Sequence, residues 1–267
     1  MTCVGDDPEG NRAVALLEAE GADVVAIRQT DKVTPFKTRV IANGTHLLRL
    51  DRETTDDLSV LAEEELLAFL PGAVSSSDVV LVSDYCKGVC TARVMQVVLG
   101  LAHRASIPVV VDSKRLDVGR YFGATAMTPN EVEICALIGE QALTRALLDR
   151  VRVEHGLRWL VVTLGPHGLF AVGPSGEQVR LAALADEVVD VGGAGDALAA
   201  TMACLMARGV EMARTLQISS AVAALTLRDY RHKRVSVEDL CEKLRRGNAL
   251  SSDIDKSMFE FDIIREA

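Results

Sequence analysis

Short apolar segments of strand length alternate along most of this chain with longer segments whose apolar residues recur at helical spacing. Strands are predicted at 23–27, 78–83, 108–112, 125–128, 159–163 and 187–189, with helical segments between most of them. This alternation predicts βαβ units, and therefore an α/β fold with a mainly parallel central sheet. The chain of 267 residues is long enough to bury the core of one such domain.

Two predicted hairpins interrupt the alternation. Segments 37–41 and 46–50 flank Asn43-Gly44, a strong signal for a two-residue hairpin turn, and we expect this hairpin to leave the main sheet. A second hairpin is predicted at 169–172 and 178–182. We expect Pro71 to end the helix predicted at 55–70. Helices are predicted at 11–20, 55–70, 91–104, 131–137, 142–154, 194–207, 211–227 and 237–246, and the tail 251–267 is left unassigned.

The composition disfavours several classes of function. A net charge of −9 argues against a nucleic-acid partner, and the short basic cluster at 228–234 is interpreted as a solvated helix end. Six cysteines form no CxxC pair and no zinc-ligand spacing, which favours free thiols in a reducing cytoplasm. We expect neither a signal peptide nor a membrane span, because no apolar run reaches the necessary length.

Polar or glycine-rich residues follow five of the predicted strands. Ligands of an open parallel sheet bind beyond the carboxyl ends of its strands, so these residues are predicted to line one crevice. Most also have a simpler interpretation: Asp84, Asp112 and Asn130 as helix N-caps, Lys87 and Lys114 as solvated side chains, and Gly165 and Gly168 as turn residues. The residues that follow these strands, and are predicted to line the crevice, are Asp84, Lys87, Asp112, Lys114, Asn130, Glu133, Thr163, Gly165, Gly168 and the segment 190–196.

The segment 190–196 has the sequence Asp-Val-Gly-Gly-Ala-Gly-Asp and lies at the start of a predicted helix. The backbone N–H groups of Gly193, Ala194 and Gly195, with the helix dipole, are predicted to stabilise a developing negative charge. Asp196 lies beside them, where a general base would be needed. This combination predicts group transfer to a hydroxyl, whereas a tight strand–helix turn is the simpler alternative. The segment lacks GxGxxG spacing, which disfavours a dinucleotide-binding oxidoreductase.

These motifs resemble those of the ribokinase-like sugar kinases of the phosphofructokinase B type. The similar segments are 4–10, 128–133, 162–168 and 190–196, and the resemblance extends from about residue 4 to residue 240. It implies a three-layer α/β sandwich with a mainly parallel central sheet and a small β-hairpin lid, formed as a single domain by 1–267. Since Gly5 lies near the start, the family's preceding strand, lid segment and sugar-binding motif are expected to be missing.

The resemblance also implies an ATP-dependent phosphoryl transfer with Mg²⁺. Asp196 would accept the proton of a sugar hydroxyl, and the N–H groups of Gly193, Ala194 and Gly195 would stabilise the transferred phosphoryl group. Mg²⁺ would be positioned by Asn130 and Glu133, largely through water. The implied nucleotide contacts are Lys114, Asn130, Thr163, Gly165 and Gly168, and the implied substrate contacts are Lys37, Arg39, Asp84, Lys87 and Asp190.

Within this family, several segments are most similar to kinases of D-glycero-D-manno-heptose 7-phosphate, which phosphorylate C1 to give the 1,7-bisphosphate. These segments are 37–40, 48–51, 83–88, 111–114 and 121–125. Two alternatives remain open: a kinase of another sugar or nucleoside, and a catalytically impaired member that binds ATP or a protein partner. The expected partners are ATP and a small phosphosugar, with neither nucleic acid nor membrane, and a homodimer is compatible with the sequence.

Overall fold

The computed structural model describes residues 1–42, 45–115, 117–139, 142–184, 192–227, 235–246 and 264–265. The chain divides into two compact units. The first comprises Met1–Ala73 and Cys86–Val98, and the second comprises Val74–Tyr85 and Leu99–Ala267. Among the described residues, no helix combines the length and the apolar character needed to cross a bilayer.

The second unit is built on a six-stranded sheet in the order β11-β10-β9-β7-β6-β5. Its parallel strands are β5 (Val80–Asp84), β6 (Val109–Ser113), β7 (Ala126–Met127) and β9 (Trp159–Thr163). Strands β10 (Leu169–Val172) and β11 (Gln178–Leu181) extend it as antiparallel hairpins. The predicted α/β class with a mainly parallel sheet is therefore confirmed.

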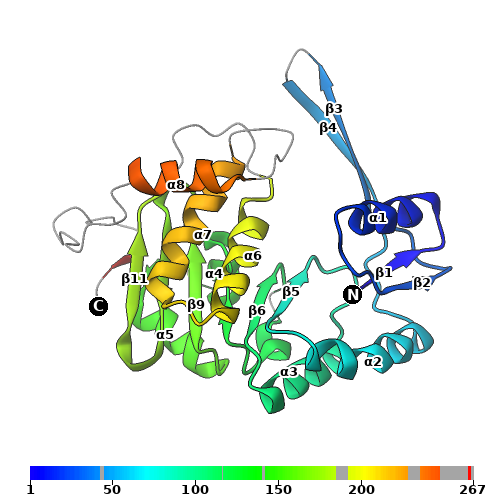
Figure 1. Cartoon of the computed structure of the whole chain (residues 1–267), viewed down its shortest axis with the longest axis horizontal. Coiled ribbons are helices and arrows are strands. Elements are labelled where there is room, and N and C mark those ends of the chain that lie inside the picture. The colour runs from blue at the N-terminus through cyan, green and yellow to red at the C-terminus, as the bar shows by residue number, and fades with distance from the viewer. Residues whose placement is uncertain are drawn as a thin grey trace. The chain divides into compact units, whose positions relative to one another are not determined.

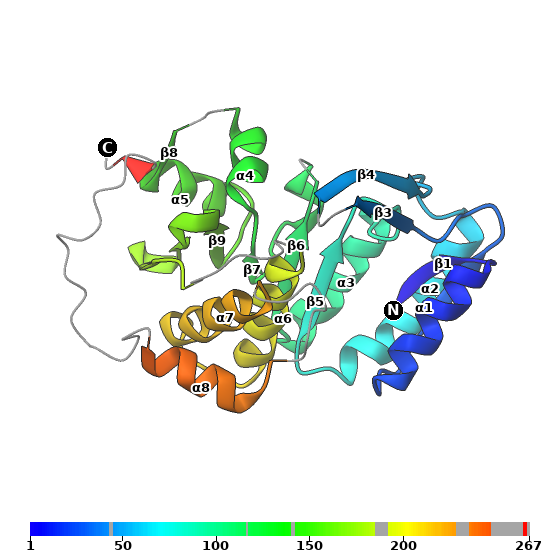
Figure 2. The same ribbon diagram turned by 90° about the horizontal axis from the view of Figure 1, so that it is seen from above.

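Helices cover both faces of this sheet (Figures 1 and 2). One face carries α6 (Ala194–Ala207) and α7 (Met212–Thr226), with α8 (Val237–Arg246) packed on α7. The other face carries α4 (Glu131–Ile138) and α5 (Arg145–Glu154). Because both faces are covered, β9 has four consecutive buried residues, Trp-Leu-Val-Val, as expected of a central parallel strand. Trp159 and Val161 of β9 share one core cluster with Leu198 and Met202 of α6.

The register brings the carboxyl ends of the parallel strands to one edge of the sheet. Ser83 of β5 pairs with Asp112 of β6, and Asp84 pairs with Ser113. Asn130, just beyond β7, forms a parallel bridge with Thr163 at the end of β9. Asp84, Asp112, Asn130 and Thr163, at or just beyond the ends of these strands, therefore lie at one edge of the sheet, whereas Lys87 belongs to the first unit.

The first unit contains β1 (Thr2–Gly5) and β2 (Ala26–Gln29), which pair in parallel and are joined by α1 (Pro8–Ala19). It also contains most of α2 (Val60–Ser75) and the start of α3 (Ala92–Ala105). Strands β3 (Phe36–Ala42) and β4 (Thr45–Arg52) form a separate two-stranded sheet, so the first predicted hairpin does leave the main sheet. The predicted turn residues Asn43 and Gly44 lie outside the described residues.

The helix predicted at 55–70 was wrong at both ends. Helix α2 runs through Pro71 to Ser75 and begins only at Val60, after Ser59, whose hydroxyl accepts a hydrogen bond from the Ala62 N–H (3.3 Å). The burial of Leu66, Leu70 and Val74 along one helical face outweighs the hydrogen bond that proline cannot make.

The second correction concerns the segment predicted as a helix from residue 142. Leu143–Thr144 instead forms the short strand β8, which pairs with β12 (Ile264–Arg265) from the tail left unassigned by the sequence. Helix α5 follows, capped by the Thr144 hydroxyl, which accepts a hydrogen bond from the Leu147 N–H (3.2 Å). A threonine N-cap thus sets the start of the helix.

Candidate active site

Asp196 lies in the first turn of α6, at the strand-end edge of the second unit. The N-cap residue of this helix is Gly193, whose φ of 79° falls in the left-handed region that glycine adopts without steric cost. The carboxylate of Asp196 accepts a hydrogen bond from the hydroxyl of Tyr85 at 2.6 Å, on Oδ1. The predicted base therefore lies at a helix N-terminus, where unpaired backbone N–H groups are available.

Two further acids and one lysine lie in the same electrostatic cluster. The ammonium of Lys114 is 3.0 Å from Glu133 Oε1 and 3.8 Å from Asp112 Oδ1. Burial raises the pKa of Asp112, and the charges of Asp196 and Glu133 add to this effect against the opposing charge of Lys114. Burial alone would lower the pKa of Lys114, but its hydrogen bond to Glu133 and the nearby carboxylates outweigh that effect and raise it.

Asn130 and Glu133 form a capping box at the start of α4. The Asn130 side chain accepts from the Glu133 N–H (2.9 Å), and Glu133 Oε2 accepts from the Asn130 N–H (2.8 Å). The N-cap interpretation of Asn130 is therefore confirmed. The same two residues are the predicted Mg²⁺ positioners, and their oxygens already have protein partners.

The donor set of this cluster fits a hydrated cation. Among the described residues, no group of three or more histidine, cysteine, aspartate or glutamate side chains is arranged to hold a metal ion directly. However, the carboxylates of Asp112, Glu133 and Asp196 all lie around Lys114, and these four groups together carry a net charge of −2. Because Mg²⁺ keeps several waters and binds chiefly through phosphates and one or two carboxylates, this arrangement suits it.

Asp84 has partners inside the protein. Its Oδ2 accepts hydrogen bonds from Arg115 Nε (2.7 Å) and the Tyr121 hydroxyl (2.5 Å), and only 3% of the residue is exposed. The Tyr121 hydroxyl also lies 3.0 Å from Ser113 Oγ. The alternative interpretation of Asp84 and Asp112 as helix N-caps is not observed, since both lie within strands. Asp190 lies outside the described residues.

Thr163, Gly165 and Gly168 form the turn between β9 and β10. Gly165 begins a single 3₁₀ turn, and both glycines have positive φ, 55° and 86° respectively. A Cβ at Gly168 would overlap the carbonyl oxygen of Leu181, whereas a Cβ at Gly165 would meet no described atom within 4 Å. Both are therefore turn glycines, but only at Gly168 does a close backbone approach also exclude a side chain.

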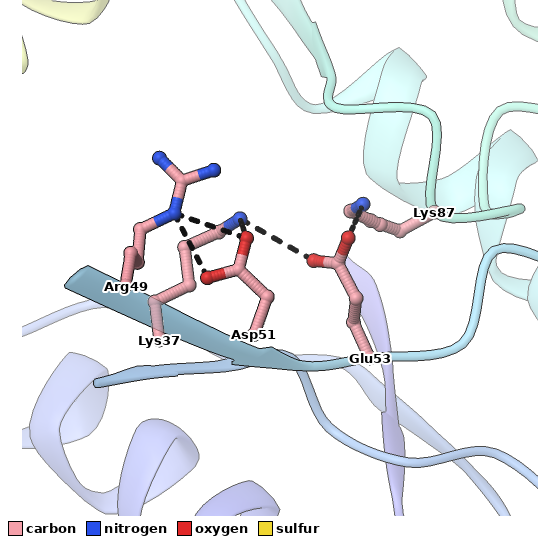
Figure 3. Close-up of polar contacts among 5 residues, drawn as sticks. All are labelled: Lys37, Arg49, Asp51, Glu53 and Lys87. Carbon is pink, nitrogen blue, oxygen red and sulfur yellow. Dashed lines mark hydrogen bonds and ion pairs between the residues drawn. The ribbon is translucent and has the colours of Figure 1, made fainter. Parts of the chain in front are cut away.

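The first unit carries a separate cluster of charges along one face of the β3–β4 hairpin (Figure 3). Lys37 Nζ lies 3.1 Å from Asp51 and 3.4 Å from Glu53. Arg49 Nε lies 2.9 Å from Asp51, and Lys87 Nζ lies 2.5 Å from Glu53. The hydrogen bond from Lys87 holds the pKa of Glu53 below its usual value. The structure thus links Lys37 and Lys87, both predicted as substrate contacts, through shared carboxylates.

Arg39, the third predicted cation of the hairpin, lies directly opposite Arg49 in the strand register. It lies two residues from Lys37 along the strand, and therefore on the same face. Together with Lys87, which reaches this face from outside the hairpin, the cluster holds four cations and two carboxylates. They are Lys37, Arg39, Arg49 and Lys87, and Asp51 and Glu53, so the cluster has a net charge of +2 on a chain of net charge −9.

Sequence reasoning did not identify Tyr85, Arg49 or Arg115 as functional candidates. Alternation along strand β4 places Arg49 and Asp51 on one face, and this signal was present in the sequence. The contact of Tyr85 with Asp196 joins residues 111 positions apart, so no local pattern could predict it.

The chain is similar to known carbohydrate kinases. A family model described as "pfkB family carbohydrate kinase" matches residues 1–236. The protein named "Bifunctional protein HldE" from Trichlorobacter lovleyi is 36% identical over 229 residues, covering 84% of this chain and 47% of that protein. The protein of the same name from Geotalea uraniireducens is 34% identical over 230 residues, with the same coverage. The chain thus spans about half the length of the curated relatives it matches.

Solved structures share the fold at low sequence identity. Phosphofructokinase-2 from Escherichia coli, in complex with potassium, matches with a TM-score of 0.77 and 18% identity, over 92% of this chain and 82% of that one. Ribokinase from Arabidopsis thaliana, complexed with ribose and ATP, matches with a TM-score of 0.71 and 17% identity, over 92% and 81%. These similarities confirm the predicted ribokinase-like α/β fold.

Proposed function

We propose a specific phosphotransfer reaction for this chain, which belongs to the pfkB family of carbohydrate kinases. In this proposal the γ-phosphoryl group of ATP passes to a hydroxyl of a phosphorylated sugar, C1 of D-glycero-D-manno-heptose 7-phosphate. The observation that carries the proposal is the position of Asp196, a carboxylate in the first turn of α6 beside left-handed Gly193. Release of ADP in the presence of a panel of sugars and sugar phosphates tests it.

In the proposed reaction, Asp196 accepts the proton of the acceptor hydroxyl as its oxygen attacks the γ-phosphorus. The new O–P bond forms while the bond to the β-phosphate breaks, and ADP leaves. The N–H groups of Gly193, Ala194 and Gly195 donate to the oxygens of the transferred phosphoryl group. A Cβ at Gly195 would meet no described atom within 4 Å, which supports the assignment of this turn as open to a ligand.

The nucleotide end of the proposed site is formed by Lys114, Asp112, Asn130 and Glu133. Mg²⁺, when bound with ATP, neutralises phosphate charge, and we assign its hydrated ion to Asn130 and Glu133. Lys114 is held between Asp112 and Glu133, so its ammonium is already oriented when the phosphates arrive. Thr163, Gly165 and Gly168 are proposed as further nucleotide contacts.

We assign the phosphate of the acceptor to the charged face of the β3–β4 hairpin. Like charges directly opposite each other in a sheet are destabilising, and Arg39 and Arg49 are such a pair. A phosphate dianion between the two guanidinium groups would relieve this repulsion and offset the net charge of +2. Lys37 and Lys87 are proposed to assist, while Asp84 and Asp190 remain predicted substrate contacts.

Replacement of Arg39 by glutamine is expected to raise KM for the phosphorylated acceptor by roughly 10- to 100-fold, the scale of a charged hydrogen bond, without changing KM for ATP. Steady-state kinetics with each substrate varied in turn measures both constants. Arg12→Gln, which removes an exposed arginine from α1 of the same unit, serves as the control and is expected to be silent. An equal rise in KM for both substrates would refute the assignment.

The opposite face of the same hairpin is largely apolar and exposed. Strand pairing places Phe36, Val40, Leu48 and Leu50 on this face, where their exposed fractions are 46%, 38%, 45% and 61%, together with Thr38 and Arg52. A two-stranded sheet is marginally stable in water unless a further surface covers it. We propose that a second copy of the chain covers this face through a two-fold contact.

Replacing Leu50 with aspartate is therefore expected to convert a dimer into monomers, because it places a charge on the apolar face. Light scattering coupled to size-exclusion chromatography measures the molar mass. Leu16→Asp, at another exposed leucine of the first unit (58% exposed), is the matched control and should leave the mass unchanged. A wild-type protein that elutes as a monomer at all concentrations would contradict this proposal.

A further inference from the structure

Tyr85 has no role in the function proposed above, yet it makes direct contact with the proposed base. It follows the last residue of β5, and its hydroxyl donates to Asp196 Oδ1 at 2.6 Å. The residue is 46% exposed, so the phenol extends along the surface to reach the carboxylate. A long exposed side chain held in this way loses rotamer freedom, and the contact must offset that cost.

We propose that Tyr85 is a positioning residue for phosphoryl transfer: its phenol fixes the Asp196 carboxylate through Oδ1 and leaves Oδ2 for the acceptor hydroxyl. The inference rests on the proposed function, and it assigns a role to a residue that lies in the similar segment 83–88 but was given no role by the sequence motifs or the family match. The χ2 torsion of an aspartate is broad, so a carboxylate without a partner samples many orientations. One fixed oxygen restricts the other to a narrow range of directions, as a general base requires.

The backbone beneath Tyr85 is itself held in place by the Asp84 network. The carbonyl oxygen of Asp84 accepts a hydrogen bond from the Lys114 N–H (3.0 Å), and its carboxylate is bound by Arg115 and Tyr121. The phenol of Tyr85 therefore extends from a rigid strand end to the rigid first turn of a helix. In this proposal buried Asp84 anchors the backbone of Tyr85, and Tyr85 in turn orients the carboxylate of Asp196.

A phenol suits this position because it donates a hydrogen bond without adding a positive charge. The described groups that interact with Asp196 include Tyr85, Asp112 and Lys114, and Lys114 is already engaged by Asp112 and Glu133. A second lysine on Asp196 would hold its carboxylate as an ion pair and weaken it as a base. Burial, together with the Asp196 hydrogen bond and the neighbouring carboxylates, raises the pKa of the Tyr85 phenol, so it stays protonated throughout the neutral range.

Tyr85→Phe is expected to lower kcat by about 10-fold, a part of the roughly 10²- to 10⁴-fold that general-base catalysis contributes, with KM for ATP unchanged. KM for the acceptor is also expected to stay unchanged, because in this proposal the phenol orients the base and contacts neither substrate. Ser236→Ala is the matched control: it removes another hydroxyl that donates to an aspartate, Asp239 (2.7 Å) at the start of α8, and is expected to lower thermal stability without lowering kcat. An unchanged kcat in Tyr85→Phe would overturn the proposal, and so would faster turnover, which would show that the phenol competes with the acceptor.

A spectroscopic measurement separates this proposal from the kinase assignment. With 3-fluorotyrosine incorporated, the ¹⁹F signal of residue 85 is assigned by its loss in Tyr85→Phe, and its phenol ionisation is followed against pH. Asp196→Asn should move that ionisation to lower pH, because a negative neighbour is removed. An unmoved midpoint would overturn the contact itself. If the midpoint moves but wild-type protein phosphorylates no acceptor, the proposed function fails, and the positioning role fails with it.

Discussion

Asp196→Asn is expected to lower turnover by at least ~10²-fold while the fold and the affinity for ATP are retained. Asparagine has almost the same shape and can still accept the hydrogen bond from Tyr85, but it cannot take the proton of the acceptor hydroxyl. Steady-state turnover, ATP binding by calorimetry and thermal unfolding together measure the three quantities. The loss should therefore appear in kcat alone.

A matched control for this variant is Glu238→Gln, which neutralises an exposed acid in the first turn of α8. Turnover of the control should equal that of the wild type, because the same change in net charge is made away from the site. Near-normal turnover of Asp196→Asn would exclude Asp196 as the base.

Gly168→Ala has the largest expected effect on stability, with a cost of about 3 kcal/mol or more in the free energy of unfolding. The residue has φ of 86°, and the added Cβ would overlap the carbonyl oxygen of Leu181 in β11. Because that oxygen belongs to the backbone, either the turn or the edge strand must move. Urea unfolding followed by circular dichroism measures the loss.

Gly165→Ala separates the two causes of this loss. Gly165 also has positive φ, at 55°, but an added Cβ there meets no described atom within 4 Å. Only the conformational cost of about 1–2 kcal/mol is expected at this position. Equal losses in the two alanine variants would show that the overlap with Leu181 is relieved without cost, contrary to our account.

The sheet was largely predictable from sequence because its central strands, β6, β7, β9 and β10, are buried on both faces. Continuous apolar runs such as that of β9 mark central parallel strands, and Asn43-Gly44 correctly indicated that a hairpin interrupts the alternation. The helix through Pro71 was missed because burial of its apolar face depends on tertiary contacts. The pairing of β8 with β12 was missed for the same reason, since these strands are distant in sequence.

The candidate site was predictable in its residue types but not in its contacts. Fold topology brings the ends of successive parallel strands together, so the order of strands along the chain is enough to group Asp112, Lys114 and Glu133. The capping role of Asn130 was also among the interpretations considered. Sequence did not show that Asp84 is buried against Arg115 and Tyr121, because that depends on how strand ends and loops pack. Assembly of 1–267 as a single domain remains a prediction.

The most direct test of the central claim is to measure ADP formation by purified protein with D-glycero-D-manno-heptose 7-phosphate, unphosphorylated heptose, fructose 6-phosphate and ribose. Our account predicts turnover with the heptose 7-phosphate, a bisphosphate product visible by ³¹P NMR, and loss of both signals in Asp196→Asn. Turnover only with an unphosphorylated sugar would contradict the assigned acceptor. ATP binding without transfer to any acceptor would contradict the claim that this chain is an active phosphosugar kinase.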